Sequence, residues 1–554
     1  MTDLQEREDV RREPDGKLPI DKVVFGVAAA ISVAFLLYGL LDADGMSDTT
    51  TKVLTWVTDS FGWLFVLTSA AFVIFSAYLA ISRYGNIKLG ADDSEPEFST
   101  FSWVSMMFAT GMGIGLMFWG VAEPLTHLNN PPMGMAEPGS PEAANLAMEY
   151  TFFHWGFHPW SMYAVIGLAI GYFAYRKGYG NLVSGTFRPL LGDRAAGPIG
   201  KAIDVIAIFA TLFGSATSLG LGALQITGGI DNVFGEGGDS KSLAVAVIGF
   251  LTLCFVVSAV TGIEKGVKYL SNANAVAAGV LVLFLFVVGP TVFILGTFTE
   301  SLGGYLTHLP TMSFRTGVFG ESAWLNSWTI FYWAWWISWT PFVGMFIARI
   351  SKGRTIRQFV IFVILVPSLV SFVWFSIMGG SAFDLQLEEG VDMPGSLAGG
   401  VENALFDTLR EFPLSSITVA LAIFLIAIFF VTGADSASIV MGMLSEHGEE
   451  EPRRWIVVFW GVAMGAVAAL LLWQGGLEAL QTLVIIVAGP FMIVLIAMCV
   501  SLMKALREEP DISLIPARER KVAREYLVPR SELPSTPLGG SVRDPDAGPD
   551  ADET

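Results

Sequence analysis

Tryptophan is concentrated in one short stretch of this chain. Residues 324–339 contain six of its 16 tryptophans. Four aromatic residues there are spaced as one stripe of a helix: Tyr332, Trp335, Trp336 and Trp339. A second aromatic group surrounds Pro159: Trp155, Trp160 and Tyr163. Several ring faces in a low-dielectric place suit a cation that cannot accept hydrogen bonds, and a quaternary ammonium is such a ligand. A membrane-interface belt is the alternative, but the stripe continues into the apolar middle of its segment.

The apolar segments that carry these rings contain no charged side chain of either sign. Among all the long apolar segments of the chain, only Asp204 is acidic. We therefore expect an aromatic pocket without a fixed countercharge. Such a pocket favours a zwitterion, which brings its own carboxylate, over a bare cation.

Membrane-spanning helices are the elements expected to position these rings. The chain is 53% hydrophobic and only 15% charged, whereas a soluble chain carries about 25% charge. A spanning helix needs about 20 apolar residues. Twelve stretches meet that requirement, near 23–41, 61–81, 101–122, 151–174, 203–230, 243–261, 273–298, 324–348, 359–378, 414–434, 455–473 and 479–503. The prediction is an all-α polytopic membrane protein with twelve transmembrane helices.

The basic residues predict the orientation. With both termini cytoplasmic, all but four of the 32 Lys and Arg residues fall in cytoplasmic segments, as the positive-inside rule requires. The exceptions are Lys52, Lys241, Arg315 and Arg410. We expect a plasma (inner) membrane location. A net charge of −19 argues against a nucleic-acid partner, and the two cysteines lie in apolar runs and predict no disulfide framework.

An internal repeat is indicated by two similar tetrapeptides. The run 287–290 (Val-Val-Gly-Pro) in the seventh span recurs as 487–490 (Val-Ala-Gly-Pro) in the twelfth, and five spans end at each copy. An odd number of spans per repeat inserts the two copies in opposite orientations. Chance similarity of a Gly-Pro pair is the alternative. The first span of each repeat is expected to be interrupted, at Gly111–Gly115 and at Pro341 with Gly344, and paired interruptions point to a transport site.

The expected organisation follows from these spans. It comprises a cytoplasmic N-terminal tail (1–22), two peripheral transmembrane helices (23–82), a first five-helix repeat (101–298), an external connecting segment (299–323), a second, inverted five-helix repeat (324–503) and a cytoplasmic C-terminal tail (504–554). Basic segments of such a tail can bind anionic lipid and regulate activity. The tail is more acidic than basic, so a solvated tail is the alternative.

Two hydroxyl-bearing segments could bind a hard cation. Thr211, Ser215 and Ser218 form a stripe in the fifth span, although such hydroxyls commonly bond their own helix carbonyls. Asp435, at the end of the tenth span, is ionisable and therefore a functional candidate; Asp435 and Arg349 are the candidate gating residues, and a simple ion pair between them is the structural alternative.

His154 and His158, spaced i, i+4, raise the alternative of an intramembrane metalloenzyme. No acidic residue in that span completes a site and Pro159 follows directly, so we expect no enzyme and no metal site at these histidines. A channel is the other alternative, which saturable binding would exclude.

One motif resembles a known family. Residues 327–336 (Ser-Trp-Thr-Ile-Phe-Tyr-Trp-Ala-Trp-Trp) resemble the signature of the betaine–choline–carnitine transporter family, and 111–124 and 154–160 are similar to its glycine betaine members. The resemblance implies an inverted-repeat fold of the neurotransmitter:sodium symporter type with two extra helices in front, usually in a homotrimer. It implies import of a zwitterionic compatible solute, glycine betaine first, with sodium by alternating access for osmoprotection. Ectoine, proline, carnitine or choline as substrate, and proton coupling, stay open.

The resemblance also implies roles for individual residues. It places the substrate ammonium among Trp155, Trp160, Tyr163 and Trp336, with Trp335 and Trp339 along the path toward the cytoplasm. The backbone of the glycine run would approach the substrate: Gly111, Met112, Gly113 and Gly115. Proton-coupled choline members carry Asp at the last of these positions, so Gly115 favours a zwitterion.

Two sodium sites are implied in the same way. The first lies near Thr211, Ser215 and Phe342. The second lies near the carbonyls of Ala109, Met112 and Phe429, with Thr432 and Gly433. Sodium-coupled relatives carry Ser at the position of Gly433, so the stoichiometry of coupling stays open. No other cofactor is implied.

Overall fold

The structure is a computed structural model that describes residues 16–510, except 112, 236–239, 262–263 and 321. For residues 108–111, 234, 240 and 264–271 it describes the backbone alone. Within these limits the elements are helices, and the β pairing consists of one bridge between Lys88 and Thr355. The all-α prediction is confirmed. Predictions for tail residues 1–15 and 511–554 fall outside the described residues, and the described residues up to Leu506 form one compact unit.

The described part of the chain contains eighteen α-helices, α1 to α18. Those before the first Gly-Pro pair are α1 (Lys22–Leu41), α2 (Ala43–Ile81), α3 (Thr100–Gly111), α4 (Ile114–Asn129), α5 (Pro141–Trp155), α6 (Phe157–Gly171), α7 (Arg188–Leu191), α8 (Pro198–Phe234), α9 (Ser240–Thr261) and α10 (Glu264–Val288). Those after it are α11 (Thr291–Ser313), α12 (Ser322–Leu325), α13 (Phe331–Ile350), α14 (Ile356–Leu387), α15 (Met393–Ala398), α16 (Ala404–Arg410), α17 (Ser415–Ser445) and α18 (Arg454–Arg507).

Many of these helices are suited to a bilayer. Among the described residues, seven are long and apolar enough to cross one: α1, α2, α8, α9, α14, α17 and α18. The pair α10 and α11, bent by 108°, would add an eighth if it forms one span. The predicted stretches near 101–122 and 151–174 are each divided into two shorter helices. Those near 455–473 and 479–503 share α18, whose backbone leaves helical geometry at Gly476. The number twelve therefore stays a prediction.

The glycine run interrupts the third predicted span, as expected. Helix α3 ends at Gly111 and α4 begins at Ile114, with Gly113 in an extended conformation between them. A second interruption, not expected from the sequence, separates α5 from α6 at Gly156. Pro159 contributes to it, because proline has no N–H to donate to the carbonyl of Trp155 one turn earlier.

The expected interruption of the eighth span at Pro341 and Gly344 is wrong. Helix α13 runs through both residues without a break. Pro341 cannot donate to the carbonyl of Ile337, but the Thr340 hydroxyl donates to that oxygen at 2.6 Å. The irregular turn instead precedes α13, as a π-helical turn at Asn326–Ile330.

The two Gly-Pro copies also differ. Gly289 and Pro290 separate α10 from α11, so the segment predicted as a span near 273–298 turns sharply and enters α11 before the expected connecting segment begins. Pro490 instead lies inside α18 without a break. A Gly-Pro pair permits such a bend, and its surroundings decide whether the bend forms.

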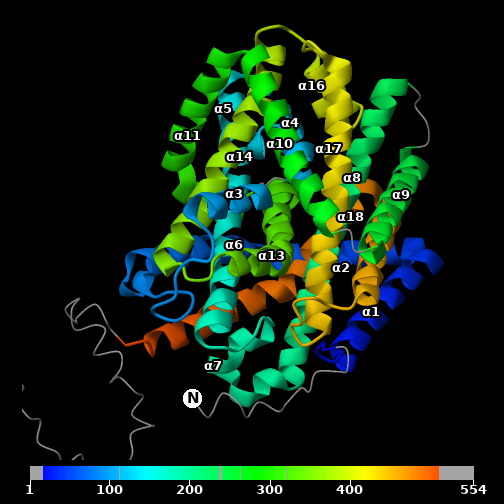
Figure 1. Cartoon of the computed structure of the whole chain (residues 1–554). Coiled ribbons are helices and arrows are strands. Elements are labelled where there is room, and N and C mark those ends of the chain that lie inside the picture. Colours follow the sequence, from blue (N-terminus) through cyan, green and yellow to red (C-terminus); the bar gives the residue numbers. More distant parts are fainter. Residues whose placement is uncertain (1–15, 112, 236–239, 262–263, 321, 511–554) are drawn as a thin grey trace, which may run out of the picture. The chain divides into compact units, whose positions relative to one another are not determined.

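Helices that are distant in sequence pack together around the middle of this unit. Helix α13 packs against both α6 and α8, and α4 packs against α5, α8 and α14 (Figure 1). The two interrupted helix pairs and the continuous Trp-rich helix are thereby brought to the same place.

Candidate functional site

A small cavity lies where α4, α5, α6, α13 and α14 meet. Its volume is about 40 Å³. The residues that line it are Gly113, Gly115, Leu116, Trp155, Pro159, Trp160, Tyr163, Trp335, Trp336, Trp339, Val343 and Ser371. The six aromatic residues that the family resemblance places along the substrate path therefore surround one cavity, which we call the aromatic box; Tyr332 of the predicted stripe does not line it.

The rings of the box contact one another at right angles and in stacks. Trp335 and Trp336 are stacked, with ring centroids 4.7 Å apart, and Trp155 and Trp336 meet edge to face, with ring centroids 4.8 Å apart. The ring centroid of Tyr163 lies 6.4 Å from that of Trp336 and 5.3 Å from that of Trp160. Of the six residues only Trp339 is more than slightly exposed. A cavity of this size holds a few waters, so these rings must separate to admit a larger solute.

Glycine is required at position 115 by the rings above it. A Cβ atom there would lie 2.9 Å from the Trp155 ring and 3.0 Å from the Trp335 ring. The absence of a side chain thus allows α4 to approach both indoles. Gly113 also lines the cavity, whereas Gly111 is described as backbone at the end of α3 and Met112 lies outside the described residues.

The break at Gly156 connects the backbone to the box. Trp336 Nε1 donates to the carbonyl oxygen of His154 at 2.9 Å, two residues before the break. A Cβ atom at Gly156 would lie 2.5 Å from the carbonyl oxygen of Phe152 and 2.8 Å from the Phe372 ring. Glycine at this position therefore allows α5 to end where it can hold the Trp336 indole.

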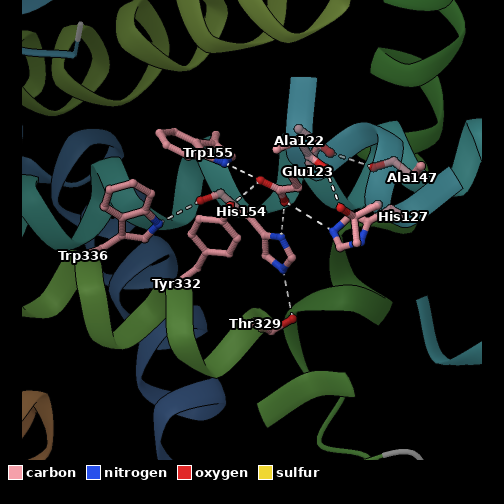
Figure 2. Close-up of polar contacts among 11 residues, drawn as sticks. Ala122, Glu123, His127, Ala147, His154, Trp155, Thr329, Tyr332 and Trp336 are labelled. Carbon is pink, nitrogen blue, oxygen red and sulfur yellow. Dashed lines mark hydrogen bonds and ion pairs between the residues drawn. The ribbon is translucent and has the colours of Figure 1, made fainter. Parts of the chain in front are cut away.

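No described acidic residue lines the cavity, as expected, but a buried acidic residue that was not anticipated contacts one of its rings. Glu123 of α4 is fully buried, and its Oε2 accepts a hydrogen bond from Trp155 Nε1 at 2.7 Å (Figure 2). Glu123 lies one residue beyond the apolar stretch 101–122, so its sequence position suggested an external loop. Helix α4 in fact continues to Asn129. His127, one helical turn after Glu123, is also fully buried, and its spacing from Glu123 was the one indication in the sequence that the helix continues.

The hydroxyl stripe of α8 has mixed partners. Thr211 Oγ1 donates to the carbonyl of Ala207 at 2.9 Å, which is the structural alternative considered for it. Ser218 Oγ donates to the carbonyl of Gly214 at 3.3 Å and lies 3.2 Å from its donor Trp335 Nε1, next to the box. Ser215 Oγ is buried and has no hydrogen-bond partner among the described residues.

The second proposed sodium site lies partly outside the described side chains. Thr432 Oγ1 donates to the carbonyl of Ile428 at 2.9 Å, and Phe429 and Gly433 lie in the same continuous helix, α17. Ala109 is described as backbone in α3, and Met112 is outside the described residues. These positions do not identify an ion.

A second cavity of about 180 Å³ lies along α13, beyond the box. Phe342, Met345, Phe346 and Arg349 line it from that helix, and Ser436, Met443 and Glu450 contribute from the α17 side. Phe342 also meets Trp339 of the box, at 5.6 Å between ring centroids. Arg349 Nη2 lies 4.0 Å from Glu450 Oε2, an ion pair at the surface; Asp435 lies one residue before Ser436 in α17.

The two histidines proposed as metal ligands face different partners. His154 Nδ1 lies 2.7 Å from Glu123 Oε1 and its Nε2 lies 3.0 Å from Thr329 Oγ1. His158 contacts Ser313 and stacks on Trp333. A different trio, Glu123, His127 and His154, has its potential ligand atoms within 4.8 Å of one another. Both ring nitrogens of His154 already contact protein groups, so a metal would have to replace those contacts.

Comparison with known proteins identifies the family. A family model described as betaine/carnitine/choline family transporter matches residues 23–511. The chain is 47% identical over 511 residues to the glycine betaine transporter OpuD of Bacillus subtilis, covering 92% of this chain and 97% of that protein. It is 47% identical over 491 residues to a probable glycine betaine transporter of Desulfitobacterium hafniense, covering 88% and 97%.

A third relative is the betaine/ectoine transporter LcoP of Corynebacterium glutamicum, 43% identical over 519 residues, or 93% of this chain and 82% of that protein. These relatives are transporters, which sets aside the enzyme alternative. The match spans both interrupted helix pairs, the Trp-rich helix and the apolar helices on either side of them. The chain therefore belongs to the betaine/carnitine/choline transporter family and is a multi-pass membrane transporter.

Proposed function

We propose that this protein is a sodium-coupled symporter that imports glycine betaine across the cell membrane by alternating access, for osmoprotection. The observation that carries the proposal is the meeting of Trp155, Trp335 and Trp336 over Gly115. N-methyl groups offer no hydrogen to a carbonyl or carboxylate, so a quaternary ammonium is held by ring faces. The names of two relatives, which refer to glycine betaine transport, support the same substrate.

The zwitterion's carboxylate also has a suitable partner. Helix α4 begins at Ile114, and its N-cap residue Gly113 lines the box together with Gly115 and Leu116 of its first turn. The first N–H groups of a helix have no carbonyl partner in the preceding turn, and its N-terminus carries positive partial charge. We propose that the carboxylate binds there while the ammonium faces the indoles. This arrangement favours a solute with opposite charges a few ångströms apart.

Two cavities on successive turns of α13 support a stepwise path. The box is a cavity of about 40 Å³, and the second, larger cavity of about 180 Å³ lies next to it, between α13 and α17. We propose that the rings separate to admit substrate from outside and that the Arg349 end of α13 opens to the cytoplasm. Twelve spans in two inverted repeats, cytoplasmic termini and a homotrimer are part of the same proposal.

Sodium is proposed as the coupling ion. Ser215 Oγ, buried and without a described partner, is available to a hard cation, and Thr211 and Phe342 would complete that site. Ala109, Met112, Phe429 and Thr432 would form a second site. Gly433 offers no hydroxyl there, so we expect that second site to bind sodium more weakly than a site with serine.

Counterflow in proteoliposomes tests the proposal. Purified protein should exchange labelled glycine betaine with an internal pool, and an imposed sodium gradient should drive its accumulation. Trp155→Leu and Trp336→Leu should each raise the KM about 30-fold, the equivalent of about 2 kcal/mol of lost cation–π energy. Trp56→Leu is the control, because Trp56 is 60% exposed on α2.

Unchanged KM values in the two box variants would refute the aromatic site. Accumulation that is driven by a proton gradient and does not depend on sodium would show that protons, and not sodium, are the coupling ion. If unlabelled ectoine competes more strongly than unlabelled glycine betaine, ectoine is the preferred substrate. The name of the third relative, a betaine/ectoine transporter, makes ectoine the competitor to test.

A further inference from the structure

The buried carboxyl group of Glu123 accepts hydrogen bonds from two helices that build the box. Its Oε2 accepts from Trp155 Nε1 at 2.7 Å and from Tyr332 OH at 2.5 Å, and its Oε1 lies 2.7 Å from His154 Nδ1. Glu123, His154 and Tyr332 are fully buried, and Trp155 is only 6% exposed. Three segments distant in sequence thus meet at one side chain.

These partners indicate which form the carboxyl group takes. An indole N–H can only donate, and the Tyr332 hydroxyl donates to the same oxygen. His154 satisfies both of its contacts with one tautomer, in which Nδ1–H donates to Glu123 and Nε2 accepts from Thr329. With His154 in this tautomer, Glu123 accepts from three donors, which is the hydrogen-bonding pattern of a carboxylate, and these donors replace much of the water that burial removes.

The network reaches both walls of the box (Figure 2). Trp155 is bonded to Glu123 directly, and Trp336 is bonded to the backbone carbonyl of His154. The Tyr332 ring stacks on His154 at 4.7 Å and on Trp336 at 5.8 Å between centroids. Rotation of the Trp155 indole away from Gly115 would therefore break a charge-assisted hydrogen bond.

A carboxylate at the N–H of an indole also changes the ring. In a low-dielectric site, a charge-assisted hydrogen bond polarises its donor, which increases the electron density on the ring face. A cation on that face is then bound more strongly, since the attraction is electrostatic. Among the described residues, Trp160 and Tyr163 complete the box without a carboxylate partner, so Trp155 is the ring that Glu123 affects directly.

We propose that Glu123 is a positioning residue of the aromatic box, which orients the Trp155 indole and strengthens its ring face for a methylated ammonium. The inference rests on the proposed function, because it assumes that the box holds such a group. The inference goes beyond the proposed function, because it assigns selectivity for positive charge to a residue that need not touch the substrate.

Glu123→Gln removes the charge and keeps the shape. We expect the KM for glycine betaine to rise about tenfold, with kcat changed less. Selectivity should fall as well: glycine betaine should lose about tenfold of its advantage over 3,3-dimethylbutanoate, in which carbon replaces the ammonium nitrogen. Glu123→Asp, which keeps the charge, should recover part of both losses. Glu149→Gln is the matched control, because Glu149 is a largely buried carboxyl group of α5 that pairs with His308 outside the box.

A double-mutant cycle tests whether Glu123 acts through Trp155. Trp155→Phe keeps a ring but removes the N–H, so Glu123→Gln should change the KM less than about twofold in that background. An equal effect in both backgrounds, or a Glu123→Gln protein that behaves like Glu149→Gln, would overturn the inference.

The indole resonance gives a readout independent of transport. In ¹⁵N-tryptophan-labelled protein, with Trp155→Phe used for assignment, the Trp155 N–H should lie downfield of the other buried indoles and move upfield in Glu123→Gln. A Trp155 resonance among the others in the wild type would overturn the inference even if the Gln variant did not fold. Absence of glycine betaine counterflow in the wild type, with the resonance downfield, would instead refute the proposed function and leave the hydrogen bond standing.

Discussion

The segment from α5 to α6 and the helix α13 each contain a proline next to the aromatic box, yet only the first is interrupted. Pro159 lies three residues after Gly156, where α5 ends and the chain changes direction. Pro341 lies within α13, which continues to Ile350. Both prolines deprive a carbonyl of its usual helical N–H donor.

The neighbouring residues explain the different outcomes. The Thr340 hydroxyl donates at 2.6 Å to the carbonyl that Pro341 leaves unpaired. The helix α13 therefore loses little hydrogen bonding at its proline. His158, which precedes Pro159, directs its ring toward Ser313 and Trp333 instead. Gly156 then adopts the backbone conformation of the break. The interrupted region supplies backbone and a hydrogen-bonded indole to the box, and the continuous region supplies a fixed row of rings.

Gly156→Ala should have the largest effect, because it attacks the interrupted region directly. The new Cβ would lie 2.5 Å from the Phe152 carbonyl oxygen and 2.8 Å from the Phe372 ring. Overpacking of this kind costs about 1–3 kcal/mol, so we expect a lower unfolding temperature in detergent and loss of most counterflow. Gly249→Ala is the control, since no atom lies within 4 Å of a Cβ at that position in α9. Equal stability of the two variants would mean that the break does not need glycine.

Thr340→Val should have a smaller effect, confined to the continuous region. The substitution keeps the side-chain shape but leaves the Ile337 carbonyl without its hydroxyl donor. Hydrogen bonds inside membrane proteins contribute about 0.6 kcal/mol on average and up to about 1.7 kcal/mol, and we expect a loss toward the upper value because the carbonyl has no helical donor. The free energy of unfolding of the wild type and the variant in detergent mixtures measures this loss of stability.

Thr227→Val, in α8, is the matched control for Thr340→Val. Thr227 Oγ1 also donates to a helix carbonyl, that of Ala223 at 2.9 Å, but this carbonyl can pair with the N–H of residue 227 itself. The control should therefore lose clearly less stability than Thr340→Val. Equal losses would show that the hydroxyl before Pro341 is not what keeps α13 intact.

Composition and periodicity were sufficient to predict the all-helical membrane class and the grouping of the rings. Both depend on local patterns: the apolar segments are continuous in sequence, and Tyr332, Trp335, Trp336 and Trp339 are neighbours on any helix. The Gly111–Gly115 interruption was also predictable, since three closely spaced glycines weaken a helix wherever it packs.

Features that depend on distant contacts were not predictable. Glu123 appeared to lie outside the membrane because the apolar stretch ends at residue 122. Its burial depends on donors from α5 and α13, which follow it by 31 to 209 positions along the chain. The Gly156 break likewise depends on how closely Phe372 of α14 approaches. The continuity of α13 had a local signal that was overlooked, the threonine before its proline.

The smallest effect is expected where the two regions meet. Trp336→Phe keeps a ring in the box but removes the N–H that joins α13 to the His154 carbonyl at 2.9 Å. One such hydrogen bond contributes about 1 kcal/mol, so the KM for glycine betaine should rise about fivefold, well below the effect of Trp336→Leu. Measured by counterflow, a fivefold rise would indicate that the interrupted region positions the ring as well as surrounding it. A KM equal to that of the wild type would mean that stacking on Trp335 alone fixes the indole, and α13 would then need no support from the break at Gly156.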